Sequence, residues 1–107
     1  MEIKSVNESR FLQIMGDSPI NRVLNFLVIN EDFDYSLTDI ANQANIGYAT
    51  LHLFWKRIEL AGIVKQTRVV GKAKMYRLNK ESPLVSNFVK MYDSVVKLKI
   101  NEKLLAH

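Results

Sequence analysis

Hydrophobic residues recur at three- and four-residue spacing along most of this chain, a pattern that predicts helices. The first predicted helix covers about residues 6–15, after a capping-box spacing at 5–8 and before Gly16 as a stop. The second predicted helix covers residues 19–30 and starts with a serine cap followed by proline. An acidic loop with a short strand near residues 35–37 follows it.

Residues 36–64 have the pattern of two short helices joined by a tight turn. The first helix starts after the cap Ser36, and the turn is formed by residues 45–47. The second helix covers about residues 48–61 and stops at Gly62. Its predicted core-facing residues are Leu51, Trp55 and Ile58.

A β-hairpin is predicted directly after this helical pair. Its strands cover residues 64–69 and 74–78, and residues 70–73 form the tip. A last helix is predicted from residue 83 to about residue 104. Its apolar positions are Leu84, Phe88, Met91, Val95 and Leu98, widened by Val85, Val89, Tyr92 and Val96.

The composition is that of one globular domain spanning residues 1–107, with 48% apolar and 24% charged residues. We therefore predict an α+β fold that is mainly α with one small hairpin. Cysteine is absent, which excludes disulfides and thiolate metal sites. The N-terminus lacks the basic-then-apolar order of a signal peptide, and no apolar run approaches the ~20 residues that span a bilayer. We expect a cytoplasmic protein without membrane contact.

The positive charge is concentrated in one part of the chain. Residues 48–80 hold eight lysines and arginines against one glutamate, whereas residues 1–47 hold three against seven carboxylates. The excess lies on the second helix of the pair and on the hairpin. Such an asymmetry indicates a surface that faces a polyanion.

The order of these elements resembles the winged helix-turn-helix domains of small transcription regulators of the MarR, ArsR and PadR type. The resemblance is carried by residues 36–78, above all by KRIELAGIV at 56–64 and YRL at 76–78. It implies a winged-helix core over residues 19–80, with an extra N-terminal helix and a long C-terminal dimerisation helix. It also implies sequence-specific binding of double-stranded DNA and transcriptional regulation.

In such folds the second helix of the pair enters the major groove, and the hairpin at 64–78 lies on the backbone or the minor groove. Tyr48, Thr50 and His52 would form hydrogen bonds there, while Ala49 and Leu53 would touch thymine methyl groups. The cations would hold phosphates. The complete predicted DNA-binding set is Tyr48, Ala49, Thr50, His52, Leu53, Lys56, Arg57, Arg68, Lys72, Lys74 and Arg77.

The C-terminal helix carries more apolar surface than one small domain needs, so we expect a homodimer. Two copies related by a two-fold axis would place the reading helices ~34 Å apart on a palindromic site. The predicted interface residues are Phe11, Leu12, Leu84, Phe88, Met91, Tyr92, Val95 and Leu98. The alternative is a monomer whose last helix covers the core.

The sequence contains no catalytic constellation, and we expect neither enzyme activity nor a cofactor. The two histidines are His52 and His107, and without cysteines they do not make a metal site. Asp32 and Asp34 are expected in a solvated loop. A protein-interaction module remains an alternative because Leu53 is hydrophobic where base-reading residues are often polar, while Phe54 is expected in the core. A non-specific architectural or DNA-segregation protein would use the same basic residues.

Overall fold

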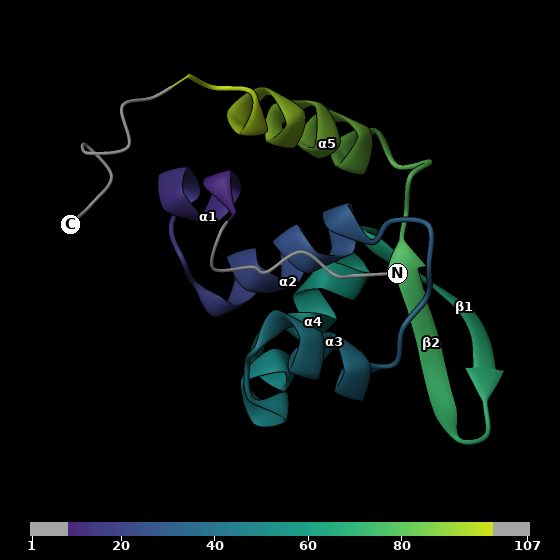
Figure 1. The fold of residues 1–107 in the computed structure, drawn as a ribbon. Coiled ribbons are helices and arrows are strands. Elements are labelled where there is room, and N and C mark those ends of the chain that lie inside the picture. Colours follow the sequence, from purple (N-terminus) through teal and green to yellow (C-terminus); the bar gives the residue numbers. More distant parts are fainter. Residues whose placement is uncertain (1–8, 100–107) are drawn as a thin grey trace.

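The computed structural model describes residues 9–99. That range contains five helices and one two-stranded antiparallel hairpin, so the predicted α+β class is confirmed. Figure 1 shows how these elements are arranged. The elements are α1 (Arg10–Met15), α2 (Pro19–Ile29), α3 (Leu37–Ala44), α4 (Tyr48–Leu60), β1 (Val64–Val70), β2 (Ala73–Leu78) and α5 (Pro83–Val96). No helix in the described part of the chain is long and apolar enough to cross a membrane.

Serine side chains begin most of these helices. Ser18, Ser36 and Ser82 each accept a hydrogen bond from the backbone N–H three residues later, at 3.2, 3.2 and 3.4 Å, as the sequence predicts. Ser9 does the same for α1 at 3.4 Å. Because Ser9 has an extended backbone, α1 begins at Arg10 and not near residue 6. The predicted capping box at 5–8 lies outside the described residues.

The core lies where α2, α3 and α4 meet. Val23 and Phe26 of α2, Ile40 and Ala44 of α3, and Leu51 and Ile58 of α4 are all buried there. The predicted inward residues Leu51, Trp55 and Ile58 are thus confirmed, and Phe54 joins the core as expected. Burial of this apolar stripe holds the short helix α4 in place, since an isolated helix of 13 residues is marginal in water.

The hairpin strands are each one residue longer toward the tip than predicted, which leaves Gly71 and Lys72 as the turn. Gly71 has φ of +63°, a conformation that glycine adopts without strain. The register shifts between Gln66 and Arg68, so Thr67 is a bulged residue in β1. At the base of the hairpin, the side chain of Asn79 donates to Gly62 O at 3.0 Å.

The strand predicted at residues 35–37 is reduced to one bridge. Tyr35 and Tyr76 exchange two backbone hydrogen bonds, each of 2.8 Å, and residue 37 already belongs to α3. The Tyr35 ring packs on Phe26 of α2 at 4.8 Å between centroids. The edge of β2 is therefore tied to the helical core.

A second layer, formed by α1 and α5, covers the side of α2 away from the hairpin tip (Figure 1). The Phe11 ring lies 5.6 Å from Phe88 and 5.2 Å from Tyr92. Asn25 of α2 is buried and accepts hydrogen bonds of 2.7 Å from the hydroxyls of Ser9 and Tyr92. This network joins α1, α2 and α5. Burial of the Tyr92 hydroxyl raises its pKa, because the charged form is poorly solvated there.

The C-terminal helix is shorter than predicted. It ends at Val96, not near residue 104, and residues 100–107 lie outside the described range. Within residues 9–99, Val95 is the last buried residue, and Leu98 is already 46% exposed, so the apolar stripe has lost its packing there. The N–H of Leu98 bonds to Val95 O at 3.2 Å, which is a tightened final turn.

Candidate nucleic-acid interface

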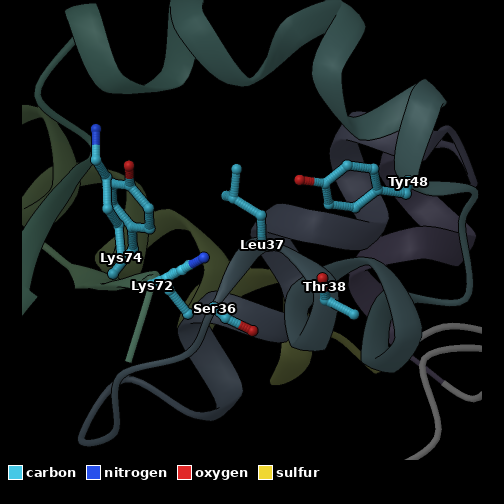
Figure 2. A pocket seen from close by; sticks show the side chains of 8 residues that line it. Ser36, Leu37, Thr38, Tyr48, Lys72 and Lys74 are labelled. Carbon is cyan, nitrogen blue, oxygen red and sulfur yellow. The ribbon is translucent and has the colours of Figure 1, made fainter. Parts of the chain in front are cut away.

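A groove of about 400 Å³ lies between the amino-terminal ends of α3 and α4 and the hairpin. Figure 2 shows Tyr48 on one side of it and Lys72 and Lys74 on the other, with Leu37 between them. The complete lining is Ser36, Leu37, Thr38, Tyr48, Lys72, Ala73, Lys74 and Tyr76. Two ammonium groups and several hydroxyls around an apolar centre suit an anionic chain.

Local backbone geometry brings these walls together. Asn45 adopts the left-handed conformation, with φ of +58°, and so turns the chain from α3 into α4. Arg22 Nη1 holds this turn by donating to Asn45 O at 2.9 Å. On the opposite wall, the tight turn at Gly71 places Lys72 and Lys74 on the face that meets α4.

The outer face of α4 is open to solvent. Of the seven α4 residues predicted to contact DNA, six are exposed and Thr50 is half-buried; the exposed six are Tyr48, Ala49, His52, Leu53, Lys56 and Arg57. The rings of Tyr48 and His52 meet edge to face at 4.4 Å. Gly47 precedes the helix and supplies no side-chain cap, so the first N–H groups of α4 have no side-chain partner among the described residues.

Two leucines on this face are the most exposed large hydrophobic residues of the described chain. Leu53 is 79% exposed and Leu60 is 76% exposed. Their seven-residue spacing places them on one face of α4. Burial of either leucine against a partner would be favourable, whether that partner is DNA or protein.

Three cations of residues 48–80 are paired within the chain. The pairs are Lys65–Glu81 at 3.0 Å, Arg68–Asp34 at 3.0 Å and Lys80–Asp32 at 2.9 Å. The prediction that Asp32 and Asp34 lie in a solvated loop is therefore wrong. Asp34 is bound to Arg68 of the hairpin, and Asp32 is bound to Lys80 just after the hairpin. The hydrogen bond from Arg68, and next that from Thr67, lowers the pKa of the Asp34 carboxyl.

Four of the predicted DNA-binding cations carry no ion pair among the described residues. Lys56, Arg57, Lys72 and Lys74 have no carboxylate within ion-pairing distance in residues 9–99. Arg68, another predicted contact, is instead engaged by Asp34. The remaining predicted contact, Arg77, is half-buried on β2, and its Nε is enclosed.

The geometry combines two short helices, a tight turn and a basic hairpin. No family model, curated protein or solved structure matches this chain. The interpretation of the site therefore rests on its own side chains. Among the described residues, no three His, Asp or Glu side chains lie close enough together to hold a metal ion.

The predicted dimer residues differ in how far the chain itself covers them. Phe11, Leu12, Tyr92 and Val95 are buried within the chain itself, and Phe88 and Met91 are half-buried. Leu84 and Leu98 are 54% and 46% exposed. Only these two members of the set offer substantial uncovered surface, and the dimer stays a prediction.

The structure also brings into the groove residues that sequence reasoning missed. Ser36, Leu37, Thr38, Ala73 and Tyr76 all line it, and none was among the predicted contacts. The start of α3 could have been expected there, because the capped end of a helix presents hydroxyls and backbone N–H groups to an anion. Asp34 was missed because its partner Arg68 lies 34 residues away.

Proposed function

We propose that this chain is a winged helix-turn-helix domain that binds double-stranded DNA, with α3 and α4 as the helical pair and the hairpin as the wing. The observation that carries the proposal is the groove in which the amino-terminal end of α4 faces Lys72 and Lys74. An uncovered helix beside unpaired cations suits a duplex, because bases and phosphates are then met by one continuous surface.

In this proposal α4 lies in the major groove. Tyr48, Thr50 and His52 offer hydrogen bonds, and Ala49 and Leu53 offer apolar contact to thymine methyl groups. Lys56, Arg57, Lys72 and Lys74 bind phosphates, so log Kd should change with log salt by a slope of about 3.6 for the four contacts of each bound protomer. Arg68 is not assigned a phosphate here because Asp34 occupies its guanidinium.

The proposal includes a homodimer that regulates transcription by occupying a promoter. The exposed Leu84 and Leu98 on and just after α5 are the surface we assign to the second copy. A two-fold pair of α4 helices would bind a palindromic site with half-sites about one DNA turn, ~34 Å, apart.

The direct test replaces both groove lysines, Lys72→Glu and Lys74→Glu, in one protein. Loss of two phosphate contacts in each protomer should weaken duplex binding at least about tenfold and lower the salt slope by roughly two units per bound protomer. Fluorescence anisotropy with a labelled duplex, repeated over a salt series, measures both quantities. Selection of bound duplexes from a random pool then tests sequence specificity and palindromic symmetry.

A matched control is Lys90→Glu with Lys97→Glu, which changes the charge equally on the exposed surface of α5 and just beyond it, away from the hairpin tip (Figure 1). This control should retain most of the binding if location decides the effect; because Lys97 adjoins Leu98, light scattering first checks that the control keeps the mass of the unaltered chain. Equal losses in both double variants would indicate binding through net charge alone, and unchanged binding by the groove variant would contradict the proposal.

A protein-interaction module is the second candidate, and the exposure of Leu53 and Leu60 favours it. Under this alternative both leucines would be covered by a partner protein. Duplex binding would then be weak, independent of Lys72 and Lys74, and unselective in the random pool.

A further inference from the structure

Asp34 lies in the loop between α2 and α3, yet its carboxylate contacts β1. Arg68 donates to it from Nε at 3.0 Å and from Nη2 at 3.1 Å, and the Thr67 hydroxyl donates to Oδ2 at 2.5 Å. The Asp34 side chain is only 17% exposed, although it belongs to a surface loop. This carboxylate is thus held by three hydrogen bonds from β1 and is largely shielded from solvent.

The same loop also holds the second strand. Tyr35 follows Asp34 and exchanges two backbone hydrogen bonds of 2.8 Å with Tyr76 of β2. Thr67 is the bulged residue of β1, and its hydroxyl also lies 3.4 Å from Met75 O across the hairpin. Two adjacent loop residues therefore hold both strands, one through its side chain and the other through its backbone.

The direction of the hairpin matters because β2 forms one wall of the groove. Lys74 and Tyr76 line the groove, and Tyr76 is the residue whose backbone is hydrogen-bonded to that of Tyr35. A change in the angle of the hairpin would move Lys72 and Lys74 relative to Tyr48 on the opposite wall. The base of the hairpin belongs to the hydrophobic core, where Val64, Tyr76 and Leu78 are buried and Trp55 packs edge to face on Tyr76 at 5.2 Å. Thr67 and Arg68, which Asp34 holds, lie further toward the tip, where the strands are exposed.

We infer that Asp34 is a positioning residue for DNA binding: its carboxylate fixes the hairpin against the helical pair and thereby sets the separation of the groove lysines from α4. This inference rests on the proposed function. Asp34 itself touches no DNA in this scheme and acts through Arg68 and Thr67.

The direction in which removal of Asp34 changes DNA affinity distinguishes a positioning role from a purely electrostatic one. Asp34 carries a negative charge close to a surface that would bind phosphates, so its removal should tighten DNA binding if charge alone decided. Release of Arg68 as an additional phosphate contact would tighten binding further. Positioning predicts the opposite, because a loosened hairpin must be ordered again when DNA binds.

The experiment compares Asp34→Ala with Asp32→Ala in the full chain, using a labelled duplex over a salt series. Asp32 belongs to the same loop and loses the same charge, but it pairs with Lys80, which lies beyond β2, at 2.9 Å. We expect Asp34→Ala to bind roughly three- to tenfold more weakly than the unaltered chain. Asp32→Ala should bind equally or slightly more tightly.

Hydrogen exchange gives a readout that needs no DNA. The N–H groups of Tyr35 and Tyr76 should exchange faster in Asp34→Ala than in Asp32→Ala, because local opening of the bridge becomes easier. If Asp34→Ala fails to fold, Asp34→Asn keeps the side-chain shape and one acceptor, and it should show the same changes to a smaller degree.

The inference is overturned if Asp34→Ala binds as tightly as or more tightly than the unaltered chain, or if its salt slope is steeper by about one unit. Unchanged exchange at Tyr35 and Tyr76 would overturn it as well. Absence of duplex binding by the unaltered chain is a different result, since that outcome removes the proposed function itself.

Discussion

Leu53 lies on the exposed face of α4, the helix that we propose reads base edges, and is 79% exposed. Its neighbour one turn earlier is Ala49, also apolar and exposed. The two form a short apolar stripe between Tyr48 and the cation Lys56. In the major groove the matching chemical group is the 5-methyl of thymine, the one apolar group that base edges present there.

We therefore predict that replacing thymine by uracil in the bound half-site weakens binding at the positions facing Leu53. Each buried methyl is worth about 0.8 kcal/mol, or roughly a fourfold change in Kd. Competition binding with duplexes substituted one position at a time measures this effect.

Leu53→Ala is the control for this prediction, because it should remove the difference between thymine and uracil. The variant should fold normally, since Leu53 is 79% exposed. Persistence of the full uracil effect in Leu53→Ala would assign the methyl contact to another residue.

At the scale of elements, the hairpin is held by ion pairs as well as by its backbone ladder. The Asp34 carboxyl has its pKa lowered by Arg68 and then by Thr67, and the Glu81 carboxyl has its pKa lowered by Lys65. A carboxylate whose folded pKa lies below the unfolded value stabilises the fold above the unfolded pKa, and this contribution is lost as pH falls through the folded pKa.

We predict that the hairpin is weakened by acid, in the range below the ordinary aspartate pKa of about 3.9. Thermal unfolding followed by circular dichroism from neutral to acid pH should show a falling midpoint in this range. Asp34→Asn should flatten the dependence, because it removes the titrating group. An equally steep fall in Asp34→Asn would place the acid sensitivity in other carboxyls.

The elements differ in how far the sequence alone could predict them. Caps depend on neighbours three residues apart, so Ser18, Ser36 and Ser82 could be placed from local pattern. The end of α5 could not be placed in this way, because apolar spacing continues to Leu98 whereas Val95 is the last buried residue of the range 9–99. Periodicity shows which residues could form a stripe, but only packing shows where the stripe ends.

The candidate site was predictable in outline and not in its pairings. The exposed face of α4 and the two tip lysines follow from helical spacing and turn position. Arg68 was expected to contact DNA but is bound to Asp34 across 34 residues of sequence. Such a pairing depends on tertiary structure, and the only signal in the sequence was an acidic loop in a chain with a basic hairpin.

At the scale of the whole molecule, Leu84 and Leu98 form the exposed apolar surface that we assign to a second copy. We predict that the chain forms a dimer and that Leu84→Glu with Leu98→Glu makes it monomeric. Both side chains are about half exposed in the single chain, so the two substitutions together should cost the folded monomer about 1 kcal/mol of stability. Light scattering coupled to size exclusion measures the mass, and anisotropy should show weaker binding to a palindromic duplex because bivalent attachment is lost.

Leu60→Glu serves as the comparison, because Leu60 is also a leucine and is even more exposed, at 76%, but lies on α4. It should leave the mass unchanged. A monomeric mass for the unaltered chain would contradict the dimer, and dissociation caused by Leu60→Glu alone would place the contact on α4.

The outer side of β1 has no neighbouring strand in residues 9–99, and Val69 and Val70 near its end are 56% and 50% exposed. An unpaired strand with apolar side chains is a template for strands of other molecules. The hairpin tip is therefore the place where concentrated samples would begin to aggregate. A bound duplex lying along the hairpin would shield this edge, so nucleic acid should improve the solubility of the protein.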